Sequence, residues 1–152
     1  MNPLNAKYVH TNLVARDWQK LADFYQTVFG CLPVPPTRDY SGELFDQLAN
    51  LTQARQRGMH LRLPGFTDHA PTLEIFEYQP ALDKPATKVN RQGYGHIAFA
   101  VDDVQAALEL VLQHGGGQVG QVVTLTRADG QQVSVVYATD PENNVVELQK
   151  WS

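Results

Sequence analysis

This 152-residue chain has few cysteines, few basic residues and no long apolar run, and each absence excludes a class of protein. Its one cysteine, Cys31, cannot form an intrachain disulfide, which fits a reducing cytoplasm. A net charge of −4 argues against a nucleic-acid partner, which would need a basic face. No segment approaches the roughly 20 apolar residues of a membrane span. The opening MNPLNAKYVH also lacks the basic-then-apolar order of a signal peptide. We expect a cytoplasmic protein that binds neither nucleic acid nor membrane.

The two halves of the chain resemble each other. The run HTNLVARDWQKLA begins at His10 and the run HIAFAVDDVQAAL begins at His96, and the two align without a gap. Late in each half a glutamate lies inside an apolar strand, Glu74 in LEI and Glu147 in VEL. With 43% hydrophobic and 18% charged residues, the composition is that of a globular protein. We therefore expect a single domain over residues 1–152, built from two repeats at about 6–80 and 93–151.

Each half has the pattern β-α-β-β-β, which predicts an α+β fold. Period-2 alternation and turn residues indicate strands, and apolar residues at helical spacing after Asp17 and Asp103 indicate helices. The segment 31–57 holds three prolines and no clean period, so we expect an irregular strand with a loop or short helix. The expected strands are 7–14, 58–63, 72–78, 94–101, 121–127, 132–138 and 145–150, and the helices run from Asp17 to Gly30 and over 103–113.

Strand parity places the two histidines and the two glutamates on equivalent faces. In YGHIAFAV the large apolar residues share one face and His96 lies on the other, and in VVELQK Glu147 lies opposite the packing face. The same parity holds for His10 and for Glu74, whereas Glu77 shares the packing face. If each half curls its sheet into half a cup, the four side chains line one cavity. The alternative is four unrelated polar residues on exposed strand faces.

Two imidazoles and two carboxylates suit one divalent ion such as zinc, nickel, cobalt, manganese or iron(II). The predicted metal ligands are His10, Glu74, His96 and Glu147. The ion would polarise a carbonyl of a small-molecule substrate and stabilise an enediolate, and Glu147 or Glu74 would be the catalytic base. The same alternation places His60, Arg62 and Phe76 on this face, so they are candidate substrate-binding residues. The alternatives are that His60 forms a hydrogen bond to a metal-binding side chain and that Phe76 packs in the core.

The stretches HTNLVARDWQKLADFYQTVFG, LEIFEY, GYGHIAFAVDDVQAAL and DPENNVVEL resemble the vicinal oxygen chelate superfamily of glyoxalases, epimerases, dioxygenases and fosfomycin or bleomycin resistance proteins. The resemblance implies paired βαβββ modules that form a cupped mixed sheet with helices outside and a metal in the cup. It carries over the ligands His10, Glu74, His96 and Glu147, a set similar to that of the lyase and isomerase members.

The expected function is therefore that of a metal-dependent lyase or isomerase of the glyoxalase type. An iron(II)-dependent dioxygenase and a non-catalytic small-molecule binding or resistance protein are the alternatives. The resemblance also implies a homodimer, with the cup formed within one chain or across the dimer. Epimerase members have a further glutamate before the third strand, where the nearest carboxylates here are Glu43 and Asp46. Arg38 and Arg91 would serve an anionic substrate or are solvated loop residues.

Overall fold

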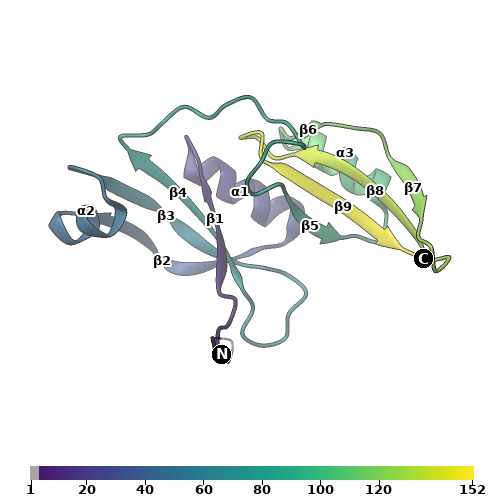
Figure 1. Cartoon of the computed structure of the whole chain (residues 1–152), viewed down its shortest axis with the longest axis horizontal. Helices are drawn as coiled ribbons and strands as arrows, with labels where there is room; N and C mark the ends of the chain where they lie inside the picture. Colours follow the sequence, from purple (N-terminus) through teal and green to yellow (C-terminus); the bar gives the residue numbers. More distant parts are fainter. Residues whose placement is uncertain (1–3) are drawn as a thin grey trace. The chain divides into compact units, whose positions relative to one another are not determined.

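The computed structural model describes residues 4–152, which divide into two compact units, one ending at Leu82 and the other beginning at Asp83. The first unit is a four-stranded mixed sheet with two helices (Figure 1). Its strand order is β1-β4-β3-β2, with β1 parallel to β4 and the other neighbours antiparallel. Its elements are β1 (His10–Val14), α1 (Trp18–Phe29), β2 (Leu32–Ser41), α2 (Glu43–Ala49), β3 (Arg55–Arg62) and β4 (Thr72–Gln79).

The second unit repeats this plan with a five-stranded mixed sheet and one helix among its described residues. Its first strand, β5, is again parallel to its last, β9, and β9 pairs with β8 in antiparallel fashion. Strands β6 and β7 both pair with β8. The elements are β5 (Ile97–Ala100), α3 (Val104–Gln113), β6 (Gly117–Gln118), β7 (Val123–Thr126), β8 (Gln132–Thr139) and β9 (Val145–Trp151). The predicted α+β fold with mixed sheets is confirmed.

The two long helices begin in the same way. Asp17 and Asp103 both have extended backbones, and the side chain of each accepts a hydrogen bond from the backbone N–H three residues later. Such caps satisfy amide donors that a helix start leaves unpaired. The helix ends differ, because Gly30 closes α1 in the left-handed conformation whereas His114 closes α3.

Each helix packs on one face of its own sheet, α1 on β3 and β4 and α3 on β8 and β9. Burial of these apolar faces is the main force that holds each layer pair together. The core side chains that are at most 2% exposed include Leu21, Tyr25, Leu61, Leu73, Ile75, Leu108, Val111, Val136, Val146 and Leu148. The Cys31 thiol is also buried, and burial raises its pKa to about 11, as suits a packing residue. No helix within residues 4–152 is long and apolar enough to cross a membrane.

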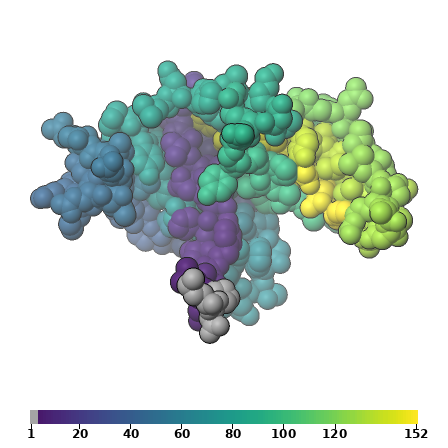
Figure 2. Space-filling model, in the orientation of Figure 1, coloured from purple at the N-terminus to yellow at the C-terminus, as the bar shows by residue number. Residues whose placement is uncertain are grey.

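The segment 31–57 holds the strand β2 and the short helix α2, in line with the expected irregular strand and short helix. The pairing of β2 with β3 shifts register between Val34 and Arg38, around a cis peptide bond at Pro35–Pro36. In the second unit the equivalent strand is split into β6 and β7. Helix α2 lies at the surface of its unit, where Leu44 and Leu48 are each 82% exposed (Figure 2).

Two expected strands begin three residues later than predicted, and the strand expected from residue 121 begins two residues later, at Val123. The first starts at His10 rather than at residue 7, and the strand expected over 94–101 covers only Ile97–Ala100. In the second case Gly93 has a φ of 114°, which breaks extended structure, and Tyr94 is fully exposed. The hairpin expected across Ala128–Gly130 is present as β7 and β8, with Gly130 in a left-handed turn conformation.

Candidate functional site

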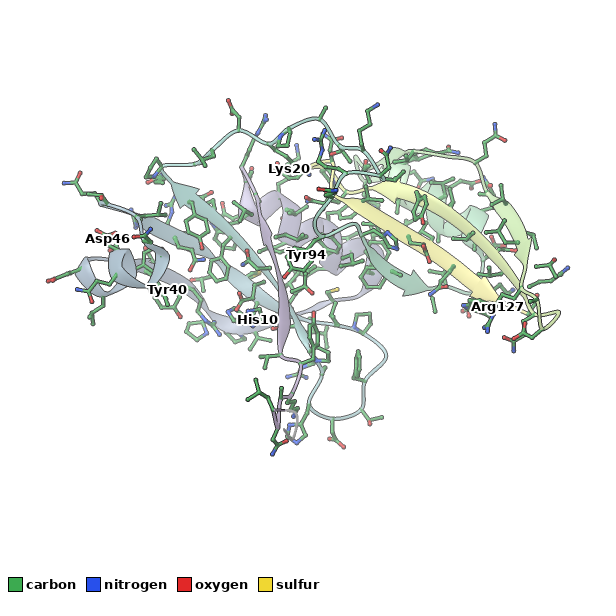
Figure 3. The ribbon with its side chains drawn as sticks, viewed as in Figure 1. His10, Lys20, Tyr40, Asp46, Tyr94 and Arg127 are labelled. Carbon is green, nitrogen blue, oxygen red and sulfur yellow. The ribbon has the colours of Figure 1, made fainter. Side chains whose placement is uncertain are left out.

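The polar face of the first unit is the sheet face that α1 does not cover. Leu61, Leu73 and Ile75 lie under the helix and are at most 1% exposed. Because successive side chains alternate across a strand, His10, His60 and Glu74 project from the opposite face. Figure 3 labels His10 on β1, which pairs with β4. The strands thus place His10 and Glu74 on the same sheet face, as the alternation in the sequence predicts.

Glu74 lies at the centre of a polar cluster on this face. The β1–β4 register sets Asn12 opposite Glu74, and the β3–β4 register sets His60 opposite it from the other side. One carboxylate oxygen, Oε2, lies 3.3 Å from His10 Nε2 and 3.3 Å from Asn12 Nδ2. The other oxygen, Oε1, lies 2.9 Å from His60 Nε2. The Glu74 side chain is 13% exposed, so neighbouring side chains supply most of its polar contacts.

His60 holds Glu74 from β3 and has a perturbed pKa. Burial lowers the pKa of His60 from its ordinary value, and the charges of Arg38 and His10 lower it further, while the Glu74 carboxylate opposes them. A neutral His60 with its proton on Nε2 donates to Glu74 Oε1. The ring also lies edge-on to Phe76, with centroids 5.7 Å apart. His60 is therefore fixed on two sides and orients the Glu74 carboxylate.

The second unit carries a matching pair. His96, the residue before β5, places Nε2 at 3.2 Å from Glu147 Oε2. Their side chains are 34% and 17% exposed. Strand β8 sets Tyr137 opposite Glu147, and the Tyr137 ring lies 5.1 Å from the His96 ring.

The two pairs are built by the same register. Asn12, two residues after His10, lies opposite Glu74, and Ala98, two residues after His96, lies opposite Glu147. Each histidine and glutamate are therefore joined by an identical parallel strand pairing. The pairs differ on the other strand that neighbours the glutamate. In the first unit β3 sets His60 opposite Glu74, and in the second unit β8 sets Tyr137 opposite Glu147.

Each pair has the spacing of two neighbouring ligands of one metal ion. With metal–ligand bonds of about 2.1 Å, neighbouring donor atoms on a tetrahedral or octahedral ion lie about 3.0–3.4 Å apart. The nitrogen–oxygen distances of 3.3 Å and 3.2 Å fall in that range. Within residues 4–152, however, no group of three or more histidine, cysteine or acidic side chains is arranged to hold a metal. Each unit by itself thus supplies two donors that fit a divalent ion.

The remaining candidates have varied surroundings. Arg62 is exposed at the end of β3. Phe76 is only 2% exposed and packs against His60. Substrate contact by either residue stays a prediction.

Two acidic residues of the first unit have structural partners. Glu77 forms an ion pair with Arg57 on the helix-side face, as its parity indicates. Asp46, labelled in Figure 3, accepts hydrogen bonds of 2.8 Å from the backbone amides of Gln53 and Ala54 and so closes the turn after α2. Asp46 therefore has a structural role, and no catalytic role is assigned to it.

Two neighbours of the glutamates were missed in the sequence. Asn12 and Tyr137 are found only from the pairing between strands that are far apart in the chain. The available signal for Asn12 was its position two residues after His10 on the same strand face. Once β8 and β9 are paired, the position of Tyr137 opposite Glu147 corresponds to that of His60 opposite Glu74.

The fold and the site together define a class of protein. It is an α+β chain of two units, each with a histidine–glutamate pair on the sheet face that its long helix does not cover. The family model described as Glyoxalase/Bleomycin resistance protein/Dioxygenase superfamily matches residues 7–148. The chain belongs to this superfamily, as the sequence resemblance predicts.

Solved structures share the fold at low sequence identity. A glyoxalase family protein from Bacillus cereus is 17% identical with a TM-score of 0.72, over 99% of this chain and 96% of that one. The fosfomycin resistance protein FosX from Listeria monocytogenes, in complex with Mn(II) and sulfate, is 15% identical with a TM-score of 0.53, over 97% and 93%. A virulence protein from Salmonella typhimurium is 20% identical with a TM-score of 0.55, over 99% and 100%. No curated protein sequence matches the chain significantly.

Proposed function

We propose that this protein is a metal-dependent lyase or isomerase of the glyoxalase type that acts on a small carbonyl compound. One divalent ion would be held by His10 and Glu74 together with His96 and Glu147, either within one chain or between two chains of a homodimer. The observation that carries the proposal is the identical register of the two pairs, with nitrogen–oxygen distances of 3.3 Å and 3.2 Å. Superfamily membership and the Mn(II) bound to FosX are consistent with it.

The two carboxylates would have different tasks. A divalent ion held by these residues would supply Lewis acidity that polarises the substrate carbonyl. His60 and Asn12 each contact one oxygen of Glu74, and these contacts restrict the movement of its carboxylate. Glu147 pairs with His96, and the Tyr137 ring lies beside that histidine. Glu147 is therefore the better candidate to move a proton between substrate carbons, with Glu74 as the second candidate.

Metal analysis of purified variants tests this proposal. The protein is loaded with Mn(II), and bound metal is measured beside turnover of hemithioacetal and acyl-CoA substrates. Removal of a residue that only hydrogen-bonds to a metal ligand lowers metal affinity by roughly 10- to 100-fold. Because His96 and Glu147 would bind the metal directly, we expect His96→Ala and Glu147→Gln each to lower the affinity by more than this. Far-UV circular dichroism should stay unchanged. His114→Ala, which removes an exposed histidine at the end of α3, is the matched control and should retain full metal. Full occupancy in both site variants contradicts the proposal.

A dioxygenase is the second candidate, because one observation favours it. That chemistry needs one glutamate off the iron, and Glu74 already has His60, Asn12 and His10 as partners. Oxygen uptake with catechols after iron(II) loading separates this candidate from the first. A protein that retains the metal without turning over any of these substrates is instead a binding or resistance protein.

A further inference from the structure

We propose that residues 84–91 form a strap in the second unit, and that Lys84 and Thr87 anchor this strap on the turn over residues 140–144 and thereby position His96 beside Glu147. Lys84 and Thr87 are positioning residues, because they act on the pair through the backbone. The inference deepens the proposed function. It rests on that function only for its effect on metal binding, since the position of His96 is measured without metal.

The two site histidines differ in how their backbones are held. In the first unit the strand pairing includes the histidine itself, because β1 begins at His10, which lies opposite Thr72. In the second unit the pairing of β5 with β9 begins with Ile97 opposite Val146. His96 therefore lies one residue outside the sheet, and the pairing alone does not hold its backbone.

The segment that leads into His96 has little to hold it in place. Residues 88–96 are all exposed, and Tyr94, labelled in Figure 3, is fully so. Gly93 and Gly95 flank that tyrosine and allow the backbone many conformations. Exposed backbone with few buried contacts opens at low cost in free energy. An anchor for His96 on this side must therefore lie further upstream.

The turn over residues 140–144 is a firm platform for such an anchor. Asp140 is 1% exposed, and its Oδ1 accepts hydrogen bonds of 2.9 Å from the backbone amides of Glu142 and Asn144. Its Oδ2 accepts a further bond of 2.7 Å from Asn144 Nδ2. The turn leads directly into β9, which carries Glu147.

The strap binds the oxygen atoms of this turn. Lys84 Nζ donates to the Glu142 carbonyl oxygen at 3.1 Å and to Asn144 Oδ1 at 2.8 Å. Thr87 Oγ1 donates to the Asn143 carbonyl oxygen. Hydrogen bonds from an ammonium group are stronger than those between neutral groups. Lys84 is therefore the main anchor, and Thr87 adds a second point three residues further along the chain.

Arg91 folds the end of the strap back on itself. Its Nη2 donates to the Ala86 carbonyl oxygen at 2.9 Å, and its backbone amide donates to the Lys88 carbonyl oxygen at 3.2 Å. Only residues 92–96 then separate the anchored strap from β5. The same contacts thus tie the segment before His96 to the turn before β9.

Release of the strap would free residues 84–96 instead of residues 92–96 alone. His96 would then spend less time beside Glu147, and the apparent affinity for a shared metal falls with the fraction of molecules that are correctly arranged. Loss of the free energy of one net hydrogen bond changes such a fraction by about 3- to 10-fold.

NMR spectroscopy of the metal-free full-length protein tests the position of His96. The ring centroids of His96 and Tyr137 lie 5.1 Å apart, so their protons should give a nuclear Overhauser cross-peak in wild type. We expect Lys84→Met and Thr87→Val to weaken this cross-peak and to lower the backbone order parameters of residues 84–96 below about 0.6. Lys84→Arg, which keeps the charge and the donors, should restore both.

Lys88→Met is the matched control, because it removes the same charge from an exposed position on the same strap. It should leave the cross-peak and the order parameters as in wild type. Absence of the cross-peak in wild type, unchanged spectra in both Lys84→Met and Thr87→Val, or an equal effect of Lys88→Met overturns the inference.

Mn(II) affinity of the same variants separates positioning from a purely structural role. We expect about 3- to 10-fold weaker binding to Lys84→Met and Thr87→Val. Loss of a positive charge alone would instead favour a cation, so Lys88→Met should bind Mn(II) at least as well as wild type. A purely structural role would lower the free energy of unfolding and leave the Mn(II) affinity of the folded protein unchanged, which contradicts the positioning role in metal binding. If wild type binds no Mn(II) while the cross-peak depends on Lys84, the proposed function fails and the positioning of His96 stands.

Discussion

Replacement of Gly58 by alanine tests the packing of the candidate face. An alanine Cβ would lie 2.7 Å from Phe76 Cδ1, a separation that real Cβ contacts essentially never show. Phe76 is 2% exposed and cannot move without disturbing His60, whose ring lies edge-on to it. Over-packing of this kind costs about 1–3 kcal/mol, more than the gain of up to about 1 kcal/mol from replacing glycine within a strand.

We therefore expect Gly58→Ala to lower the free energy of unfolding by about 1–2 kcal/mol, measured by urea denaturation with an unchanged slope. Gly95→Ala is the matched control, since a Cβ there meets nothing within 4 Å and the backbone is outside the left-handed region. It should leave stability unchanged or raise it by about 0.4–1 kcal/mol. If Gly58→Ala is as stable as Gly95→Ala, the described packing of β3 on β4 is refuted.

Two further predictions concern titratable groups. Burial raises the pKa of Cys31 to about 11, so the folded protein should react very slowly with Ellman's reagent at pH 8 and fully in urea; rapid reaction when folded would contradict its burial. The Arg55 guanidinium lowers the pKa of Asp39 below its ordinary value of 3.8, so the contribution of this pair to stability is present above that pH and is lost as the pH falls through the lowered pKa. In Arg55→Gln the Asp39 midpoint, followed by NMR, should return toward 3.8, and an unchanged midpoint would show that the pair does not form in solution.

The sequence was most informative where local rules decide the structure. Asp17 and Asp103 were expected helix starts, and both cap their helices, because a short side-chain oxygen satisfies the first free amides. The faces of Glu74 and Glu147 followed from alternation beside buried neighbours.

What lay beyond the sequence depends on pairing between distant strands. Nothing local indicates that His60 contacts Glu74 or that Tyr137 lies opposite Glu147, because β3 and β8 acquire these neighbours only through register. The strand partner of Arg38 could not be predicted either. Four positions separate Val34 from Arg38 on β2, but only two separate their partners His60 and Gly58 on β3, so the register shifts by two residues.

The central claim is that both histidine–glutamate pairs bind the same ion. The most direct measurement is pulsed electron paramagnetic resonance of the Mn(II)-loaded protein, which counts the imidazole nitrogens coupled to the metal. We expect two coupled imidazoles in wild type, and one in both His10→Gln and His96→Gln wherever metal is still bound. A spectrum that one of these substitutions leaves unchanged would show that the ion is held without that pair, and would contradict the claim.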